Sequence, residues 1–548
     1  MQSYFAGGGG NATSTDDDGG GAADSFTLYF NNLYSVYSWP NVILPFFGGY
    51  LSDLLGTRLM LLVFLGFITL GQAVFALGST LPGMAAWYVM WTGRTIFGFG
   101  GESLSVAQSA LIATWFGGKE MAFALGLNLS LARMGSVIND KVSNWLATDY
   151  SVPLAFWVGF GVCLLSLLAG MFTFALDQAS EDTLRKNQGK SPIKRLSTLQ
   201  LITCVPLWRR CCAGGEQRQA QDAESLERLV GEHLTEEEGA ESPSYEPEEP
   251  TEVIELSAAR HFPLTFWLLC VSCVCTYACV LCFNNVAEAF FAQKWLATEN
   301  GQWLPVSKLS DATMKSVNDK ATTLLLITYL VAAFLAPLFG GLIDWLGCRA
   351  ILTAFSSGLI TVRLHFLSLR GLAAHASPLH ANPPPHTHPF PPFFFGTAQV
   401  VHVLLAYLPR DSVGPEGPLV LLGLCYSIYA SALWPSVALV TERKHHGTAY
   451  GIVTAIQNLG MAVIPMGVGS LQPKSHCPTY EDCVSSWVKV ETLLICFGAL
   501  GFLSSLALNI VDARSRIQVL NWSNKRVEEA RKAELESVDL KIRDIGKP

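Results

Sequence analysis

Long stretches without a single charged side chain constrain this chain more than any other feature. Residues 59–77, 153–176 and 321–343 contain no Lys, Arg, Asp or Glu. The hydrocarbon core of a bilayer is about 30 Å thick, and about 20 apolar residues in a helix are enough to cross it. Half of the 548 residues are hydrophobic and only 15% are charged. The chain is therefore predicted to be an all-α membrane protein.

The apolar stretches predict eleven membrane spans, divided into five and six by a long polar segment. That segment, residues 177–261, is basic at first and acidic from Asp222 onward, a composition typical of a disordered linker. We therefore expect an N-terminal bundle at residues 1–176, a C-terminal bundle at 262–511 and a tail at 512–548. The spans are expected at residues 26–51, 59–79, 84–115, 120–140, 152–176, 262–291, 320–343, 350–371, 416–440, 447–470 and 487–511.

The distribution of Lys and Arg predicts the orientation of the spans. Arg58, Lys119 and Arg349 fall in short loops on one side, together with the basic tail. The opposite loop at residues 78–83 and the segment 1–25 contain neither Lys nor Arg. Because cytosolic loops are enriched in these residues, the first side and the C-terminus are expected to be cytosolic, and residues 1–25 lumenal.

Two features of the lumenal side follow from this orientation. Asn11 opens the sequence Asn-Ala-Thr, which is an acceptor for N-glycosylation on that side. Cys477 and Cys483 lie in one lumenal loop, where an oxidising environment favours a disulfide between them.

A repeated motif relates the two halves of the chain. Its copies, which we call the repeat loops, occupy residues 49–58 and 340–349, at an offset of 291 residues. A second set of glycines repeats at an offset of 325 residues. Two halves repeated in the same sense indicate a membrane fold of two parallel bundles. The loop residues are Gly49, Asp53, Gly56 and Arg58 in the first copy, and Gly340, Asp344, Gly347 and Arg349 in the second.

The repeat also locates an insertion and a gap. The two offsets differ by 34 residues, so the second half carries a surplus. We expect it at about residues 372–410, which are rich in His and Pro, either as a long non-cytosolic loop or as a segment foreign to the natural coding sequence. Two spans precede residues 340–349, but only one precedes 49–58. A helix equivalent to 262–291 is therefore expected before Met1, completing two six-helix bundles with both termini in the cytosol.

Two ionisable residues inside predicted spans are the first candidates for a binding site, because charges in a bilayer are costly. Glu102 lies 14 residues from Phe116 and Arg133 lies 13 residues from Glu120, where their spans meet the cytosol. At about 1.5 Å per residue, both are about 20 Å deep. They form either a structural ion pair or the two poles of a site for a zwitterion, with Arg133 on a carboxylate and Glu102 on an ammonium.

Further candidates surround this pair. Arg94, eight residues before Glu102, is either a second cavity group or an internal helix brace. The second half offers neutral hydrogen-bonding groups at matching positions: Tyr426, Gln457 and Asn458. Paired Cys-x-x-Cys steps lie on the apolar span 262–291, where thiols are ordinary core residues. We expect no metal, cofactor, nucleic-acid partner or enzyme chemistry.

The repeat loops resemble the signature loop of the major facilitator superfamily. Segments 37–41 (Tyr-Ser-Trp-Pro-Asn), 98–108, 130–136 and 447–460 resemble more narrowly its lysosomal dipeptide transporters. This resemblance covers nearly all the predicted spans. It implies the major facilitator fold, with each Asp and Arg of a repeat loop serving as a charged gating latch, although a solvated turn explains these residues too.

The same resemblance implies a function. It implies a lysosomal membrane protein that exports dipeptides as a uniporter and associates with a glycosylated single-span accessory protein. Two other classes stay open. A transporter of other organic anions needs Arg133 but not Glu102, and a non-transporting accessory or scaffold protein needs neither.

Overall fold

The computed structural model describes residues 19–117, 120–187, 256–299, 301–357, 398–410, 414–473, 479–515, 517–530 and 533. The chain divides into two units. One comprises residues 1–171 and 254–548, and the other comprises residues 172–253. The second unit contributes only the last part of helix α6 to the described residues, so the account below concerns the first.

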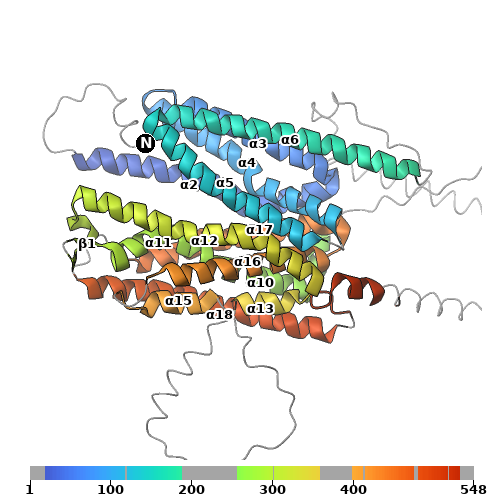
Figure 1. Cartoon of the computed structure of the whole chain (residues 1–548). Helices are drawn as coiled ribbons and strands as arrows, with labels where there is room; N and C mark the ends of the chain where they lie inside the picture. The colour runs from blue at the N-terminus through green and yellow to red at the C-terminus, as the bar shows by residue number, and fades with distance from the viewer. Residues whose placement is uncertain are drawn as a thin grey trace, which may run out of the picture. The chain divides into compact units, whose positions relative to one another are not determined.

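The first half consists of long helices joined by short turns (Figure 1). Residues 177–187, which we expected in the linker, continue the last of these helices. α3 and α4 pack closely around Met60, Phe64 and Ala107. The helices are α2 (Gly19–Leu55), α3 (Thr57–Gly78), α4 (Gly83–Phe116), α5 (Met121–Asp149) and α6 (Val152–Asn187).

The second half contains a span that has no counterpart among the described residues of the first. It comprises α10 (Leu264–Tyr277), the π turn η2 (Ala278–Cys282), α11 (Phe283–Phe291) and the π turn η3 (Ala292–Leu296). The other elements are η1 (Leu256–His261), β1 (Thr298–Glu299), β2 (Gln302–Trp303), η4 (Val306–Lys308), α12 (Asp311–Leu346), α13 (Arg349–Ser357), α15 (Ala398–Tyr407), α16 (Glu416–Leu439), η5 (Arg443–His445), α17 (His446–Leu471) and α18 (Tyr480–Arg514). The two strands form a small antiparallel hairpin that pairs Thr298 with Trp303.

Eight helical stretches within the described residues are long and apolar enough to cross a membrane. They include α3, α6 and α12. A span is helical because in a bilayer its backbone N–H and C=O groups must bond within the segment. α2, α4 and the pair of α13 and α15 fall outside this group. The all-helical membrane fold agrees with the prediction, but the count of eleven spans is not confirmed.

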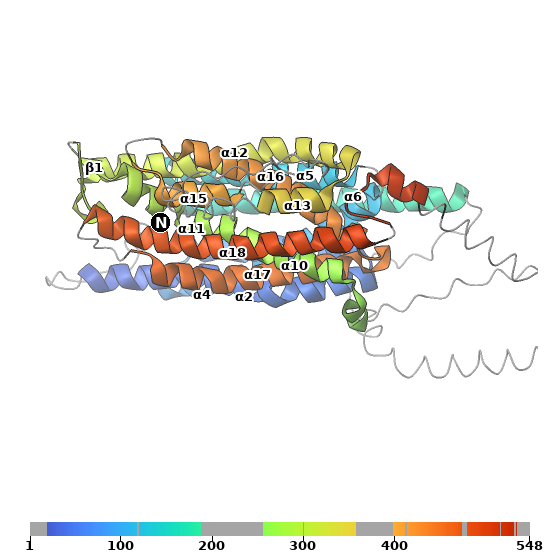
Figure 2. The same ribbon diagram turned by 90° about the horizontal axis from the view of Figure 1, so that it is seen from below.

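The structure describes part of one predicted span and a helix within the range expected for the insertion. The span expected at residues 350–371 is described only as α13, which ends at Ser357. Residues 398–407, which we assigned to the insertion, form α15 instead, with Val401 and Leu405 fully buried. α13 and α15 lie end to end beside α18 (Figures 1 and 2). Together they take the place that α3 has in the first half.

Two helix pairs join the halves. α2 packs against α17, and α12 packs against α5. The repeat matches α2 with α12 and α5 with α17, so each half contributes the same two helices to the interface. The tail also begins inside the bundle, since Leu520 is fully buried and its carbonyl accepts a hydrogen bond of 2.8 Å from Arg349 N.

Candidate substrate-binding site and gate

Glu102 and Arg133 face the same level of the bundle from neighbouring helices. Glu102 is on α4 and Arg133 on α5, and both side chains are half-buried. At about 1.5 Å per residue, each lies about 20 Å from the end of its helix at the repeat loops. Glu102 lies within electrostatic reach of Arg133, but the ion pairs recorded in the described residues do not include one between them. The arrangement leaves both charges available to a third group.

Arg133 is held by aromatic side chains of the opposite half. Its Nη2 donates a hydrogen bond to the hydroxyl of Tyr426 on α16. The guanidinium carbon lies 5.2 Å from the ring centre of Tyr426 and 5.5 Å from that of Tyr329 on α12. Such distances are typical of cation–π contacts. The Nε of Arg133 is buried and has no hydrogen-bond partner in the described structure, so one donor of the fork remains free.

Asn41 connects Glu102 to the other half. This buried residue of α2 accepts a hydrogen bond of 3.3 Å from the backbone N–H of Glu102 through its side-chain oxygen. Its carbonyl accepts one of 2.8 Å from Nδ2 of Asn458 on α17. Asn458, which the sequence proposed as a neutral partner, therefore lies at the same interface as the charged pair.

The other two predicted residues make their recorded contacts within one half. Gln457 accepts a weak hydrogen bond from the Cys273 thiol at 3.7 Å, within the second half. Arg94 stacks over Phe75 at 4.5 Å and over Phe97 at 5.7 Å, within the first half. These contacts are those of an internal helix brace, which is one of the two roles that the sequence left open for Arg94.

The sequence did not single out Asn41 and Tyr329 as site residues. Both are polar side chains inside predicted spans, which is the signal that drew attention to Glu102 and Arg133. Their importance comes from pairing across the interface, which spacing along one helix does not reveal. In the described residues, no group of three or more His, Cys, Asp or Glu side chains could hold a metal ion.

The first repeat loop caps a helix of the opposite half. Asp53 accepts hydrogen bonds from Gly447 N at 2.7 Å, Thr448 N at 2.6 Å and Thr448 Oγ1 at 2.6 Å. These amides belong to the first turn of α17, whose N–H groups lack partners within the helix. A Cβ on Gly49 would collide with the Gly447 carbonyl, so the two backbones meet only because both residues are glycines.

The second repeat loop makes the symmetric contact. Asp344 accepts a hydrogen bond of 2.9 Å from Phe123 N in the first turn of α5. It also forms an ion pair of 3.2 Å with Arg349, which is fully buried and donates a further hydrogen bond of 3.0 Å to Asn524 in the tail. Gly126 on α5 packs against the carbonyl of Ala336 on α12. The predicted Asp–Arg latch is thus present in the second loop.

The remaining loop residues have structural roles. Gly56 and Gly347 adopt φ angles of 94° and 76°, which side chains rarely tolerate. Gly340 packs against the Ala122 carbonyl of α5, and Arg58 lies in the first turn of α3.

The described contacts place the closed end of the bundle at the repeat loops. The inter-half bonds of Asp53 and Asp344 lie at that end, and those of Arg133 and Asn41 lie at mid-depth. Between the two levels, the Ser130 hydroxyl donates to the Ala333 carbonyl. The site is therefore sealed from the repeat-loop side in this structure.

Two predicted modifications stay predictions. Cys483 is disulfide-bonded, but its expected partner Cys477 lies outside the described residues. Asn11 lies outside them too.

A two-half helical bundle with a polar site across the interface defines a membrane transporter. The model of the Major Facilitator Superfamily matches residues 21–465, and the chain belongs to this superfamily. Two solved structures show the same fold. The proton:xylose symporter XylE aligns with a TM-score of 0.52 and 12% identity over 88% of this chain and 86% of its own. The fucose:proton symporter FucP of E. coli aligns with 0.50 and 13% over 88% and 91%.

Curated relatives are similar over most of the sequence. The lysosomal dipeptide transporter MFSD1 of Homo sapiens is 29% identical over 514 residues, which are 92% of this chain and 82% of the relative. The protein of the same name from Danio rerio is 28% identical over 456 residues, 81% of this chain and 72% of its own. The major facilitator fold expected from the repeat is therefore confirmed, as is the resemblance to the dipeptide transporters.

Proposed function

We propose that this transporter carries small zwitterions, dipeptides above all, as a uniporter in the lysosomal membrane. One observation supports this most directly. Glu102 and Arg133 lie at one depth, with opposite charges, and are not paired to each other. The relatives named lysosomal dipeptide transporters supply the substrate class and the compartment.

The geometry suggests a role for each group. Arg133 would fork the substrate carboxylate through Nη and the unpartnered Nε, since guanidinium and carboxylate match in two parallel hydrogen bonds. Glu102 would pair the free ammonium. The rings of Tyr329 and Tyr426 keep the guanidinium in place without neutralising it. A site that fixes the two termini and offers neutral groups elsewhere would accept varied side chains.

Alternating access would follow from the two repeat-loop caps. The structure is sealed on the repeat-loop side, which the Lys and Arg distribution predicts to be cytosolic. Breaking the Asp53 and Asp344 caps would open that side and release substrate to the cytosol. The tail would lie in the cytosol, as the Lys and Arg distribution predicts, and a glycosylated single-span accessory subunit would associate with the transporter, as the resemblance implies.

The test is uptake by proteoliposomes, with thermal stability measured in parallel. Arg133→Lys keeps the charge but loses the fork, and should strongly reduce uptake. Glu102→Gln should reduce uptake of free-amine dipeptides more than of N-acetylated ones. Arg94 is another half-buried arginine of the same half, so Arg94→Lys is the matched control and should leave the rate of uptake unchanged. A transporter of other organic anions would tolerate Glu102→Gln.

The double variant Glu102→Gln with Arg133→Gln decides whether the two residues form a substrate-binding site or a structural ion pair. A structural pair leaves one buried charge alone in each single variant, at a cost of about 3–5 kcal/mol, and the neutral double variant regains stability and transport. A binding site predicts a stable double variant that does not transport. Uptake by the double variant at the parent's rate would refute the assignment.

A further inference from the structure

Three ionisable side chains are buried in the second half, away from the central site. His402 on α15 and Glu491 on α18 are both 0% exposed, and Lys294 on η3 is 2% exposed. The substrate mechanism uses none of them. Buried ionisable groups in a membrane protein are costly and are functional candidates by default.

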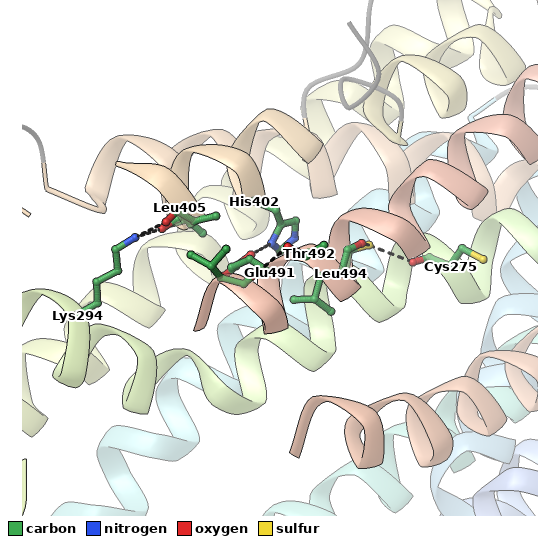
Figure 3. Close-up of polar contacts among 10 residues, drawn as sticks. Cys275, Lys294, His402, Leu405, Glu491, Thr492 and Leu494 are labelled. Atoms are coloured by element: carbon green, nitrogen blue, oxygen red, sulfur yellow. Dashed lines mark hydrogen bonds and ion pairs between the residues drawn. The ribbon is translucent and has the colours of Figure 1, made fainter. Parts of the chain in front are cut away.

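His402 and Glu491 form a direct contact between two helices. The imidazole Nδ1 lies 2.7 Å from Oε2 of the carboxylate (Figure 3). The ring of Phe283 stands edge-on to the imidazole, with ring centres 5.5 Å apart. The pair therefore lies in an apolar setting, and it is the polar link that joins α15 to α18.

His402 and Glu491 each have one polar atom without a hydrogen-bond partner in the described structure. Nε2 of His402 and Oε1 of Glu491 are buried and have no hydrogen-bond partner in the described structure. With Nδ1 protonated and donating to the carboxylate, Nε2 is a free basic nitrogen. The pair can take up one proton at Nε2. The neutral imidazole that donates to the carboxylate then becomes an imidazolium that donates to the carboxylate.

Lys294 holds the same helix from its other end. Its ammonium donates to the carbonyl of Leu405 and, at 2.9 Å, to that of Ala406 (Figure 3). These are orphan carbonyls of the last turn of α15, so Lys294 caps that helix. The ammonium also lies 4.5 Å from the ring centre of Trp295. Its charge is thus engaged with α15.

Other titratable groups lie on the elements around the pair. α15 packs on α13, α16 and α18, with Phe283 of α11 and Lys294 of η3 also against it, and none of the first-half helices contacts it closely. The titratable groups on these elements and on η2, beyond the three above, are Tyr407 on α15, Arg410 just after it, Glu416, Cys425, Tyr426 and Tyr429 on α16, Cys279 and Cys282 on η2, Glu288 on α11, Arg349 on α13, and Tyr480, Glu481, Asp482, Lys489, Cys496, Asp512 and Arg514 on α18.

We propose that His402 and Glu491 form a proton-binding site that makes this transporter respond to pH on the side facing away from the repeat loops. His402 lies five residues from the end of α15, about 7.5 Å along the helix from that face. A bound proton turns the contact between a neutral imidazole and a carboxylate into a salt bridge, in which both partners are charged, and strengthens the packing of α15 on α18. α15 also packs on α16, which carries Tyr426 of the central site.

The first measurement is thermal stability of the purified full chain at about pH 5.5 and about pH 7.5, the range in which histidine titrates. The parent should gain stability at the lower pH, because the neighbouring carboxylate holds the added proton more tightly in the folded pair than water holds it on the unfolded chain. His402→Asn keeps a donor toward Glu491 but cannot take up the proton, and should lose that gain. The double variant His402→Leu with Glu491→Met replaces the pair by apolar groups, which buried pairs often tolerate. Thr492→Val, at an exposed neighbour of Glu491, is the control.

The second measurement is uptake by proteoliposomes at the same two pH values. The ratio of the two rates should differ several-fold between the parent and either pair variant, because neither variant can bind the proton. Thermal stability needs no substrate, so its outcome does not depend on the proposed function. Equal pH dependence of stability in the parent and in both pair variants would overturn the proton site. Equal pH profiles of uptake would overturn its link to transport.

Discussion

The cap that Asp53 provides to α17 should control opening at the repeat loops. We expect Asp53→Asn to destabilise the state closed at that end. The asparagine keeps one acceptor oxygen and turns an amide group toward the three donors on Gly447 and Thr448. At least one hydrogen bond is lost, and the others lose their charge assistance.

The magnitude follows from those contacts. Hydrogen bonds to charged groups contribute about 1.5–3 kcal/mol and neutral ones about 0.5–1.5 kcal/mol. Asp53 is partly exposed, so we discount the summed loss to about 2–4 kcal/mol for the closed state. Because about 1.4 kcal/mol is a factor of ten, the population ratio of closed to open forms should fall by about 30- to 700-fold.

Hydrogen exchange in the first turn of α17 measures this opening. The amides of Gly447 and Thr448 donate to Asp53 only in the closed state, so their exchange should accelerate in Asp53→Asn. Glu120→Gln is the matched control, because Glu120 precedes α5 at the same end of the bundle and its side chain does not cap that helix. Unchanged exchange at these two amides, with uptake equal to the parent, would refute the gating role of the loop.

Three further predictions concern the insertion, Arg94 and the N-terminal segment. Deleting residues 361–394, a stretch between α13 and α15 as long as the 34-residue difference between the offsets, should join α13 and α15 into one helix and leave uptake at the parent's rate; a loss of uptake at normal expression would show that the segment is needed. Arg94→Met should lower thermal stability by up to about 2 kcal/mol, the strength of a desolvated cation–π contact, and leave the KM for dipeptides unchanged. A raised KM would show that Arg94 contributes to substrate binding. Asn11→Gln should abolish a glycosidase-sensitive shift in gel mobility; an unshifted parent would contradict the predicted lumenal position.

The internal repeat allowed the fold to be predicted from the sequence. Spacing within the two loops identified Asp53 and Asp344, and residue counts from the span ends placed Glu102 and Arg133 at one depth. Both inferences need only the rise of a helix and the sign of charges, which local sequence carries. The neutral partners were found in part, since Tyr426 and Asn458 meet the charged pair across the interface whereas Gln457 does not.

What the sequence did not reveal has a physical origin too. Residues 398–407 follow a stretch rich in His and Pro, so composition assigned them to the insertion, whereas they form α15. α15 has only ten residues, too few to be recognised as a span, and it is fixed by polar contacts of His402 with distant Glu491. Contacts of this kind join positions 89 residues apart, and one sequence does not reveal them.

The exchange of helix caps between the halves has a genetic consequence. Asp53 and the α17 amide that it binds are 394 residues apart, and Asp344 and its partner amide are 221 residues apart. Second-site suppressors of a defect in one repeat loop should therefore map to the first turn of α17 or α5, in the half that does not contain the defect. Likewise, each half expressed by itself would present one bare helix end and one aspartate without its partner amides, and mixing separately expressed halves should restore both caps.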